Sequence, residues 1–482
     1  MYVSLRIDQQ CDGRGFVNRQ SLAASCAILL AASIFDAGMC THGAQAVEDN
    51  WPQFRGEFSQ GVANNPDLPD HWSATENILW KHDVAGRGWS SPIVWGQRVF
   101  LTSVASDEDV AGAVLKRGIY FGGDRHEPSK AVHRWRVVCL DLADGHVLWE
   151  HVAHRGLPPQ SAHLKNTYAS ETPVTDGERV YAYFGNLGVF CYTVEGEPLW
   201  SRTLGAYKTA DGMGTGGSPI AHQDRVYILN DNEDQSFLLA LDKKTGAEIW
   251  RTLRPEKSSW STPYIWTSGK RTEIVISGSE TVRSYDLDGK PLWHLGGMTV
   301  HSIPTPVAGP ELLFVASGHV LGAKRPIVAI RPGADGDITL RGEQTSNDFV
   351  AWSLRKASPY NTSILFYRDH IYVLTDLGIL SCYDAHTGRT AYEKKRLPNG
   401  RAFTASPWAY NGQIFCLSEY GETFVIKAGP EFELLHLNSL SEDETYMATP
   451  AIASNKLLVR SDRGIYSIQN LAKGAPKTDR SP

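Results

Sequence analysis

The stretch NDNED at residues 230–234 places five oxygen-bearing side chains in a row. Carboxylate and amide oxygens are the ligands that hard cations such as Ca²⁺ prefer, and the same groups bind the hydroxyls of sugars. A run of this kind is equally typical of a solvated acidic loop at the rim of a fold. The residue types alone leave both interpretations open.

Further candidates for a binding site fall into two kinds of loop. The loops that lead into the innermost strand of each repeat unit, called lead-in loops below, carry Trp89, Asn166, Tyr168, Glu171, Trp260, His301, Tyr360, Asn361 and Phe403. The loops between the second and third strands carry Asn186, Asp231, Asn232, Glu233, Glu280, Asp376, Glu419 and Asp462. If these side chains converge, they would suit a sugar-like or peptide ligand, or a hard cation. His301 has no second histidine or cysteine at ligand spacing and is not expected to hold a metal.

The elements that position these residues belong to an internal repeat. Eight β-rich segments open with Ser or Thr, mostly before proline, at Ser91, Thr172, Ser218, Thr262, Thr305, Thr362, Ser406 and Thr449. Most neighbouring openings are about 44 residues apart, and in the sixth unit Ser363 is interpreted as replacing the proline. Proline lacks an N–H and is tolerated at the first residue of a strand. A period of this length indicates a solenoid or a propeller.

Each unit continues with a second strand after a glycine turn, a third strand, an Asp-containing turn with glycine, and a fourth strand. An aromatic residue follows that second glycine by four residues in Gly145/Trp149, Gly196/Trp200, Gly246/Trp250, Gly289/Trp293 and Gly388/Tyr392. Four short antiparallel strands per unit are the signature of a propeller blade. The sequence therefore predicts an all-β protein, an eight-bladed β-propeller of four-stranded antiparallel blades.

The closure of the ring is also predicted. The last unit ends at IYSIQN, residues 465–470, without a fourth strand. An unpaired strand-like segment, ENILWKHDV at residues 76–84, carries Trp80 at the place of a blade-ending tryptophan. We expect this N-terminal strand to complete the eighth blade, so that no sheet edge in the ring stays open.

The ends of the chain suggest export. Basic residues precede the apolar run Ser21–Phe35, and the small-residue sequence AQA ends at Ala46, which together predict a secretory signal peptide at 1–46. An uncleaved anchor is the alternative, although the apolar run is short for a span of roughly 20 residues. We expect an N-terminal extension at 47–75, the propeller at 76–471 with an insertion at 107–135 in the first blade, and a disordered tail at 472–482. The formal net charge of -6 argues against a nucleic-acid partner.

The cysteines fit the repeat better than a disulfide pattern. Cys139, Cys191 and Cys382 occupy one repeat position, which alanine or serine fills in other units. Equivalent positions on neighbouring blades are too far apart for a disulfide, and free cysteine packs as a small hydrophobic residue. We expect structural thiols at these positions and at Cys416.

The aromatic residue that ends each blade is expected to dock against the next blade. Burying an indole ring removes about 150–250 Å² from water, so losing one should cost about 3–5 kcal/mol. The predicted docking residues are Trp80, Trp149, Trp200, Trp250, Trp293 and Tyr392. Trp250 in particular is expected to be buried between two blades, away from the central channel.

ALDKKTGAEIW, residues 240–250, matches the tryptophan-docking motif A-x-D-x-x-T-G-x-x-x-W of quinoprotein propellers. Degenerate copies are LDLADGHVLW, YDLDGKPLW and YDAHTGRTAY, ending at residues 149, 293 and 392. From Trp80 to Asn470 the chain resembles the PQQ-binding-like β-propeller repeat superfamily. That superfamily includes dehydrogenases that use pyrroloquinoline quinone (PQQ) and a non-catalytic propeller of the bacterial outer-membrane Bam assembly complex. The opening WPQFRGEFSQG, residues 51–61, further resembles exported propellers of planctomycete-like bacteria.

The resemblance implies two different functions, and the sequence favours the non-catalytic one. The dehydrogenases commonly use a disulfide between adjacent cysteines, and no Cys-Cys pair occurs here, nor a Cys-x-x-Cys-His motif. We therefore expect an exported, periplasmic or envelope-associated monomer that serves as a scaffold or binding module, with no catalytic residue and no bound metal. Outer-membrane biogenesis is one role that the resemblance implies. The expected partner of the protein is an envelope protein or a small carbohydrate-like ligand. The alternatives are a PQQ- and calcium-dependent alcohol or sugar dehydrogenase and a carbohydrate-binding propeller.

Overall fold

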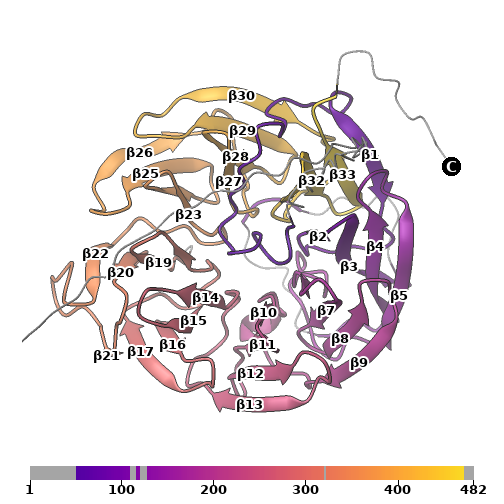
Figure 1. Cartoon of the computed structure of the whole chain (residues 1–482), viewed down its shortest axis with the longest axis horizontal. Helices are drawn as coiled ribbons and strands as arrows, with labels where there is room; N and C mark the ends of the chain where they lie inside the picture. The colour runs from indigo at the N-terminus through magenta and orange to yellow at the C-terminus, as the bar shows by residue number, and fades with distance from the viewer. Residues whose placement is uncertain (1–49, 109–115, 120–126, 320–321, 472–482) are drawn as a thin grey trace, which may run out of the picture. The chain divides into compact units, whose positions relative to one another are not determined.

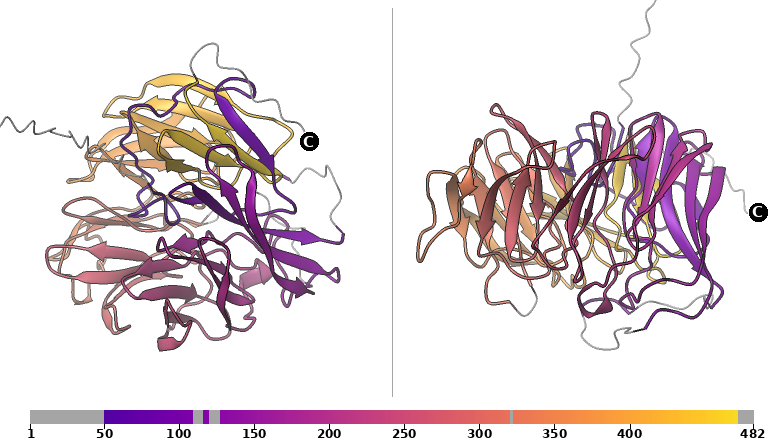
Figure 2. Two further views of the ribbon diagram at one scale, coloured as in Figure 1. Left: turned by 45° about the vertical axis from the view of Figure 1, so that its right-hand side comes forward. Right: turned by 90° about the horizontal axis from the view of Figure 1, so that it is seen from below.

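Eight β-sheets stand around a common centre in a computed structural model that describes residues 50–108, 116–119, 127–319 and 322–471 (Figure 1). The predicted signal peptide and C-terminal tail lie outside the described residues. Seen edge-on, the strands run across the thickness of the ring (Figure 2). The prediction of an eight-bladed propeller is confirmed.

The strands follow the chain from the innermost to the outermost position in each blade. Blade 1 is β2 (Ile93–Trp95), β3 (Arg98–Ser106), β4 (His133–Asp141) and β5 (Val147–Gly156). Blade 2 is β6 (Val174–Thr175), β7 (Arg179–Phe184), β8 (Gly188–Thr193) and β9 (Pro198–Thr203). Blade 3 is β10 (Ile220–His222), β11 (Arg225–Asn230), β12 (Phe237–Asp242) and β13 (Glu248–Leu253), preceded by the short 3-10 helix η1 (Ala210–Gly212).

Blades 4 and 5 are joined at an outer edge. Blade 4 is β14 (Tyr264–Thr267), β15 (Thr272–Ser277), β16 (Thr281–Tyr285) and β17 (Pro291–Gly296). Blade 5 is β18 (Val307–Ala308), β19 (Leu313–Ala316), β20 (Ile327–Ile330) and β22 (Val350–Leu354). Between β20 and β22 the chain makes the two-residue strand β21 (Gly336–Asp337), which pairs in parallel with β17 and covers that edge.

The last three blades complete the ring. Blade 6 is β23 (Leu365–Tyr367), β24 (His370–Leu374), β25 (Ile379–Asp384) and β26 (Thr390–Arg396). Blade 7 is β27 (Trp408–Tyr410), β28 (Gln413–Leu417), β29 (Glu422–Lys427) and β30 (Leu434–Ser439). Blade 8 is β31 (Ala451–Ala453), β32 (Lys456–Arg460), β33 (Gly464–Ile468) and β1 (Ile78–Asp83).

The predicted closure is confirmed by the pairing of β1 with β33. Trp80 lies opposite Ser467 and Lys81 opposite Tyr466 in an antiparallel register. A strand from the start of the chain thus supplies the outermost strand of the last blade, and the ring cannot open without separating these two segments.

One boundary of the repeat differs from the sequence alignment. In blade 6 Leu365 pairs with Tyr372 as Trp408 pairs with Phe415 in blade 7, so Ser363 corresponds to Ser406. The sixth unit therefore opens at Ser363, with Ile364 in the proline place, and the alignment on Thr362 was wrong by one residue. Two adjacent hydroxyl residues made both alignments possible from the sequence.

The blade-ending tryptophans dock on the next blade as predicted in position, but several are less buried than expected. The indole N–H groups of Trp80 and Trp250 donate to the carbonyls of Leu142 (3.1 Å) and Leu287 (3.0 Å) in the next blade. Trp80 is buried, whereas Trp250 is only partly buried. Trp149 and Trp200 are partly buried in the same way. Trp250 thus lies between two blades and away from the cavity lining, as expected, with part of its side chain exposed.

The glycine of the motif belongs to the receiving side of this contact. Gly246 has φ +70°, and a Cβ built there would lie 2.4 Å from the ring of Trp200 in the preceding blade. A larger residue would therefore both strain the backbone and displace the indole. The motif of blade 3 thus receives Trp200 at its glycine and places Trp250 on the following blade, against Gly289.

Two predicted docking residues behave differently, and one was missed. The indole N–H of Trp293 donates to Glu273 in its own blade (2.7 Å), and Tyr392 packs on Phe432 of blade 7. Trp352 of blade 5 docks on blade 6, with its indole N–H donating to the Ala385 carbonyl (2.9 Å) and its ring over Gly388. The excursion between β20 and β22 separates Trp352 from its motif glycine, which hid it from the spacing pattern.

Hydrophobic side chains between neighbouring sheets form the core. Between blades 3 and 4, for example, Tyr227 and Leu238 pack with Ile274 and Tyr285. The four cysteines of the described residues, Cys139, Cys191, Cys382 and Cys416, are buried and free, as predicted. Cys139 lies opposite Trp149 in the sheet, where a small side chain leaves room for the docked ring.

The segment 50–63, called the plug below, crosses the ring on the face where each innermost strand turns into the second strand, called the turn face. It is drawn in indigo across the middle of Figure 1. Trp51 exchanges two backbone hydrogen bonds with Val94 of blade 1, and Ala63 donates to the Ala409 carbonyl of blade 7. The Arg55 side chain donates to the Ile364 carbonyl of blade 6 (2.9 Å). The plug therefore joins blades that are not neighbours in the ring.

Candidate functional site

A cavity of about 340 Å³ lies at the centre of the ring. Phe54 of the plug lies at one end of its lining, and Trp89, Lys165 and Trp260 of the lead-in loops lie around the other end. The lead-in loops and the loops between second and third strands form the opposite surface of the ring, called the loop face below. The plug therefore contributes to the lining from the turn face, and the lead-in loops contribute from the loop face.

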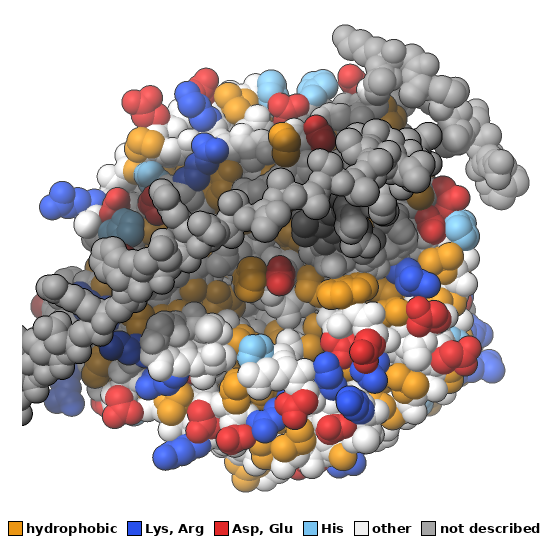
Figure 3. All heavy atoms as spheres, viewed as in Figure 1, with side chains coloured by type: hydrophobic (Ala, Val, Ile, Leu, Met, Phe, Trp, Pro, Cys, Tyr) orange, Lys and Arg blue, Asp and Glu red, His pale blue; other side chains and the backbone are white. Residues whose placement is uncertain are grey.

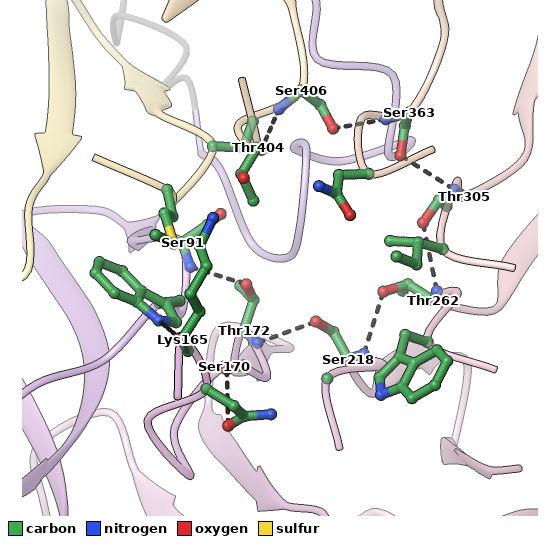
Figure 4. Close-up of a pocket in the computed structure, with 18 of the residues that line it drawn as sticks. Ser91, Lys165, Ser170, Thr172, Ser218, Thr262, Thr305, Ser363, Thr404 and Ser406 are labelled. Atoms are coloured by element: carbon green, nitrogen blue, oxygen red, sulfur yellow. Dashed lines mark hydrogen bonds between the residues drawn. The ribbon is translucent and has the colours of Figure 1, made fainter. Parts of the chain in front are cut away.

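A belt of hydroxyl side chains surrounds the cavity, one from each blade (Figure 4). Its members are Ser91, Thr172, Ser218, Thr262, Thr305, Ser363, Ser406 and Thr449, all buried. The N–H of Ser91 donates to the Thr172 hydroxyl (2.9 Å), and the same link repeats around the ring as far as the bond from Ser406 N–H to Thr449 (3.0 Å). The repeated Ser/Thr of the sequence thus ties each blade to the next at the channel.

The seam between blades 8 and 1 is held by an arginine. The Arg460 guanidinium donates to the carbonyls of Ser90 (2.8 Å) and Thr102 (2.6 Å). Burial lowers the pKa of Arg460 to about 9, so the side chain stays protonated at neutral pH. A buried cation bound to backbone carbonyls replaces the hydroxyl link at the place where the two ends of the propeller meet.

Aromatic side chains form much of the cavity wall near the loop face. Trp89 donates its indole N–H to the Lys165 carbonyl, and Trp260 donates to the Gly214 carbonyl (2.7 Å). From Trp260 the ring contacts continue through His301 and His319 to Tyr360, each at 5.4–5.6 Å between centroids. Both indole N–H groups are already bonded, so these rings offer flat apolar faces to a ligand.

Two amide side chains of the predicted set also line the cavity. Asn166 donates to the carbonyls of Met213 (3.2 Å) and Thr215 (2.8 Å) and accepts from the Tyr168 N–H (2.9 Å). These bonds fix the glycine-rich stretch 212–217 against the lead-in loop of blade 2. Asn361 lines the cavity from the lead-in loop of blade 6.

An ion pair lies at the end of the cavity near the loop face. The Lys165 Nζ lies 2.7 Å from Glu419 Oε1, and the side chains are 15% and 1% exposed. Glu419 also accepts hydrogen bonds from the Thr404 hydroxyl (2.6 Å) and the Gly118 N–H (2.7 Å). Gly118 lies in the described part of the insertion in blade 1, so this carboxylate brings together blades 1, 2 and 7.

The predicted carboxylates lie behind the wall rather than in it. Asp231, Asp376, Glu419 and Asp462 share one repeat position, just after the second strand of the blade. Asp376 accepts the N–H of Asn361 (3.0 Å), and Asp462 accepts the N–H of Thr445 (2.7 Å). Burial raises the pKa of both carboxyls. Their shared role is to hold the lead-in loops in place.

The acidic run 230–234 is a folded turn that binds itself and its neighbours. Asn232 bridges Asn230 and Gln235, and Glu233 accepts the Ser258 hydroxyl (2.7 Å). Asp231 is bonded to Arg254 (2.7 Å), and neither side chain is exposed. These oxygens do not converge on an open position, so the turn does not fit the cation site that the residue types suggested.

The other predicted residues are placed away from the cavity lining. Tyr168 donates to the Gln160 carbonyl (2.9 Å), and Glu171 accepts the Gly185 N–H (3.1 Å) next to the buried Asn186. Phe403 is buried against Phe424, and Glu280 is exposed. Of the predicted binding residues, the structure brings together Trp89, Asn166, Trp260, Tyr360 and Asn361 around one cavity.

Several lining residues had no signal as site residues in the sequence. Phe54 comes from the plug, while Met213, Ile303 and Met447 come from lead-in loops. The hydroxyl belt was visible as the opening of each repeat, but its place at the channel depends on the closed ring. Lys165 was not predicted, although it directly precedes the predicted Asn166.

Metal-binding geometry is found in the described residues at one place outside the cavity. Asp141, Asp144 and His146 have ligand atoms within 4.8 Å of one another in the outer turn of blade 1. Asp144 and His146 are exposed and bonded to each other at 2.6 Å. Across the described ranges, no helix is long and apolar enough to cross a membrane.

The donor set around the cavity does not fit the calcium ion that quinone dehydrogenases use. The described residues that line the cavity include no aspartate or glutamate. Glu419, in the loop between the second and third strands of blade 7, is bound to Lys165, which is already a cation. A site for Ca²⁺ needs several free oxygen ligands, and carboxylates are its main anionic ones.

Comparisons with known proteins agree with this fold. Solved structures with a similar fold include BamB from Moraxella catarrhalis, with a TM-score of 0.50, 12% identity, and coverage of 74% of this chain and 100% of that one. A europium-containing methanol dehydrogenase has a TM-score of 0.55, 12% identity, and coverage of 86% and 90%. Quinohemoprotein alcohol dehydrogenase from Comamonas testosteroni has a TM-score of 0.53, 11% identity, and coverage of 87% and 80%. At these identities the likeness concerns the fold alone.

The family follows from the sequence match. Comparison with curated proteins gives no significant match. A family model described as outer membrane protein assembly factor BamB matches residues 133–296 and 196–427, which together span more than half of the chain. With its eight blades, repeated docking motif and this match, the chain belongs to the family of PQQ-like β-propellers described as outer membrane protein assembly factor BamB.

Proposed function

We propose that this propeller is an exported, non-catalytic scaffold of the bacterial cell envelope, which binds a protein partner on its loop face. The observation that supports this most directly is the use of its polar loop residues. Asp231, Asp376 and Glu419 are all bonded to loop groups or to buried cations. No described carboxylate faces the cavity in a position to accept a proton from a substrate.

The loop face also carries exposed apolar side chains next to the cavity. Leu164 (40% exposed) adjoins Lys165, Val300 (39%) adjoins His301, and Leu377 (60%) adjoins Asp376. Exposed apolar groups surrounded by polar residues are typical of protein interaction sites. They come from blades 2, 5 and 6, so a partner that covers all three would lie across the cavity.

Crosslinking in native envelope extracts tests the proposal. The wild-type protein should capture a specific envelope protein, and the triple variant Leu164→Glu, Val300→Glu, Leu377→Glu should capture it at least about tenfold less. Phe58→Glu is the matched control, because Phe58 is 66% exposed in the plug on the turn face. Absence of any captured partner, or equal loss in the control, would contradict the proposal. The mass of the mature protein should also show cleavage after Ala46.

Reconstitution with PQQ and Ca²⁺ tests the dehydrogenase alternative. We expect no dye reduction with alcohols or sugars, because the lining residues provide no carboxylate for a base or for the cation. Quinone-dependent turnover by the purified protein would contradict the scaffold function and show that the protein is a dehydrogenase.

A further inference from the structure

The loop face is strongly basic over blades 5–7. Three successive loops there, at residues 317–326, 355–364 and 396–407, contain six lysine or arginine residues and no aspartate or glutamate. These six residues, called the basic rim, are Lys324, Arg325, Arg355, Lys356, Arg396 and Arg401. All but Arg325 are exposed. The whole chain carries a net charge of -6, so this concentration of positive charge is a local feature.

All three loops lie on the loop face because of their places in the blades. The first joins β19 to β20, the second leads into β23 and the third leads into β27. The second and third loops also supply the cavity residues Tyr360 and Thr404. The positive groups therefore border one side of the cavity mouth.

Within blades 5–7 little negative charge balances the rim, and the exposed carboxylates of Glu442 and Asp443 lie in the next lead-in loop, that of blade 8. Glu343 forms an ion pair with Arg355 at 2.5 Å. The other carboxylates of the neighbouring loops of blades 6 and 7, Asp376 and Glu419, are buried behind the wall. On the opposite face, by contrast, acidic and basic side chains are interspersed over the part of the surface that the grey atoms leave visible (Figure 3). A surface of one sign attracts a partner of the other sign and orients it during encounter.

An apolar feature lies between the rim and the cavity. Leu377 is 60% exposed, and its carbonyl accepts a hydrogen bond from the Arg396 guanidinium (2.5 Å). Its neighbour Asp376 holds the backbone of Tyr360 and Asn361, which line the cavity. A ligand that pairs with the rim would therefore meet an exposed leucine and then aromatic walls that contain no carboxylate.

We propose that the partner of the loop face is a protein segment rich in aspartate and glutamate, which binds the basic rim and places an adjacent aromatic or aliphatic side chain into the central cavity. The proposal rests on the proposed scaffold function and adds the chemistry of the partner. Acidic groups satisfy the rim, and the apolar anchor takes the space between Trp89, Trp260 and Tyr360.

Peptide binding to the full mature protein tests the charge requirement. The probe is a fluorescein-labelled peptide of aspartate, glutamate and glycine with one central phenylalanine, measured by anisotropy. Two comparison peptides replace the acids by their amides or the phenylalanine by alanine. We expect the acidic peptide to bind at least about tenfold more tightly than either, and its affinity to fall as salt rises from about 50 to 300 mM. Equal affinity of the amide peptide would overturn the proposal.

A matched pair of variants locates the site. Lys324→Glu, Lys356→Glu reverses two charges of the rim, whereas Lys244→Glu, Lys290→Glu reverses two exposed charges in the outer turns of blades 3 and 4. The net charge changes equally, so only a local site separates them. We expect about a tenfold loss of acidic-peptide affinity in the first variant and little change in the second. Equal effects would overturn the proposal.

The outcomes separate this inference from the scaffold function. If an envelope partner is captured on the loop face but the acidic peptide does not bind, the partner chemistry is wrong and the scaffold function stands. If the peptide binds at the rim but extracts contain no partner, the scaffold function fails and the peptide site stands. Binding of phosphatidylglycerol vesicles in place of the peptide would assign the rim to a lipid surface and overturn the proposal.

Discussion

The ammonium group of Lys165 and the carboxylate of Glu419 lie 2.7 Å apart, although they belong to blades 2 and 7. Blades 8 and 1 separate these two around the ring. The pair therefore joins two blades that are not neighbours in the ring, and the Gly118 N–H brings the insertion of blade 1 to the same carboxylate.

Removing only the cation of this pair should destabilise the protein. Lys165→Met leaves a nearly buried carboxylate without its countercharge, and we expect a loss of about 3 kcal/mol in the free energy of unfolding. Lys165→Met with Glu419→Gln should cost only about 1 kcal/mol, because no charge is left unpaired, the amide oxygen accepts from the Gly118 N–H and the amide NH2 donates to the Thr404 hydroxyl. Urea unfolding measures both. As a control, Lys427→Met breaks an exposed pair with Glu433 and should leave the melting temperature unchanged. Equal losses in the single and double variants would contradict the role of the pair.

The contribution of each docking tryptophan to the free energy of unfolding should follow the burial of its side chain. Trp352 is 7% exposed and Trp250 is only partly buried, yet each donates one hydrogen bond to the next blade. We expect Trp352→Ala to cost about 4 kcal/mol and Trp250→Ala about 2 kcal/mol in chemical denaturation. The reverse order would show that the exposed edge of the ring does not limit the contribution of Trp250.

The register of blade 6 can be tested at Ser363. Its hydroxyl accepts the N–H of Thr305 (3.0 Å), so Ser363→Ala should leave a buried N–H without an acceptor and cost about 1–2 kcal/mol. Ser363→Thr keeps the acceptor and should be close to neutral, because threonine fills this position in blades 2, 4, 5 and 8. Thermal unfolding of the three proteins compares them. Equal destabilisation by alanine and threonine would mean that packing, and not the hydroxyl, matters here.

Glu171 should make stability depend on pH. The side chain is buried, and its Oε2 has no hydrogen-bond partner, so burial raises the carboxyl pKa above its ordinary value of 4.5. The folded protein then binds this proton more tightly than the unfolded chain does. Stability from this group is therefore present at low pH and lost as pH rises through the raised pKa.

Comparison with Glu171→Gln isolates that contribution. The melting temperature of the wild type should rise relative to that of the variant as pH falls from about 8 to 5. The control Glu197→Gln changes an exposed carboxyl, so its melting temperature should vary with pH in parallel to that of the wild type. Parallel curves for Glu171→Gln would contradict the assigned cause of the pKa shift.

Part of the candidate site was visible in the sequence. The repeat assigned Trp89, Asn166, Trp260, Tyr360 and Asn361 to lead-in loops, and loops at one repeat position meet on one face of a closed ring. The carboxylates of Asp231 and Asp376 were assigned to the same face for the same reason. Their partners could not be predicted, because Arg254 and the lead-in backbone reach them through the fold rather than through a spacing rule.

By itself the sequence determined the number of blades and their strand order, because a period of turns and apolar residues recurs along the chain. It also determined the closure by β1, because the last unit lacks a fourth strand and the segment 76–84 is an unpaired strand. Only the tertiary structure decided which residue faces the channel in blade 6, where Ser363 and Thr362 are equivalent by type. It also decided that Phe54 of the plug lines the cavity and that Lys165 pairs with Glu419. These contacts join residues hundreds of positions apart, and no periodicity relates residues that meet only because the ring is closed.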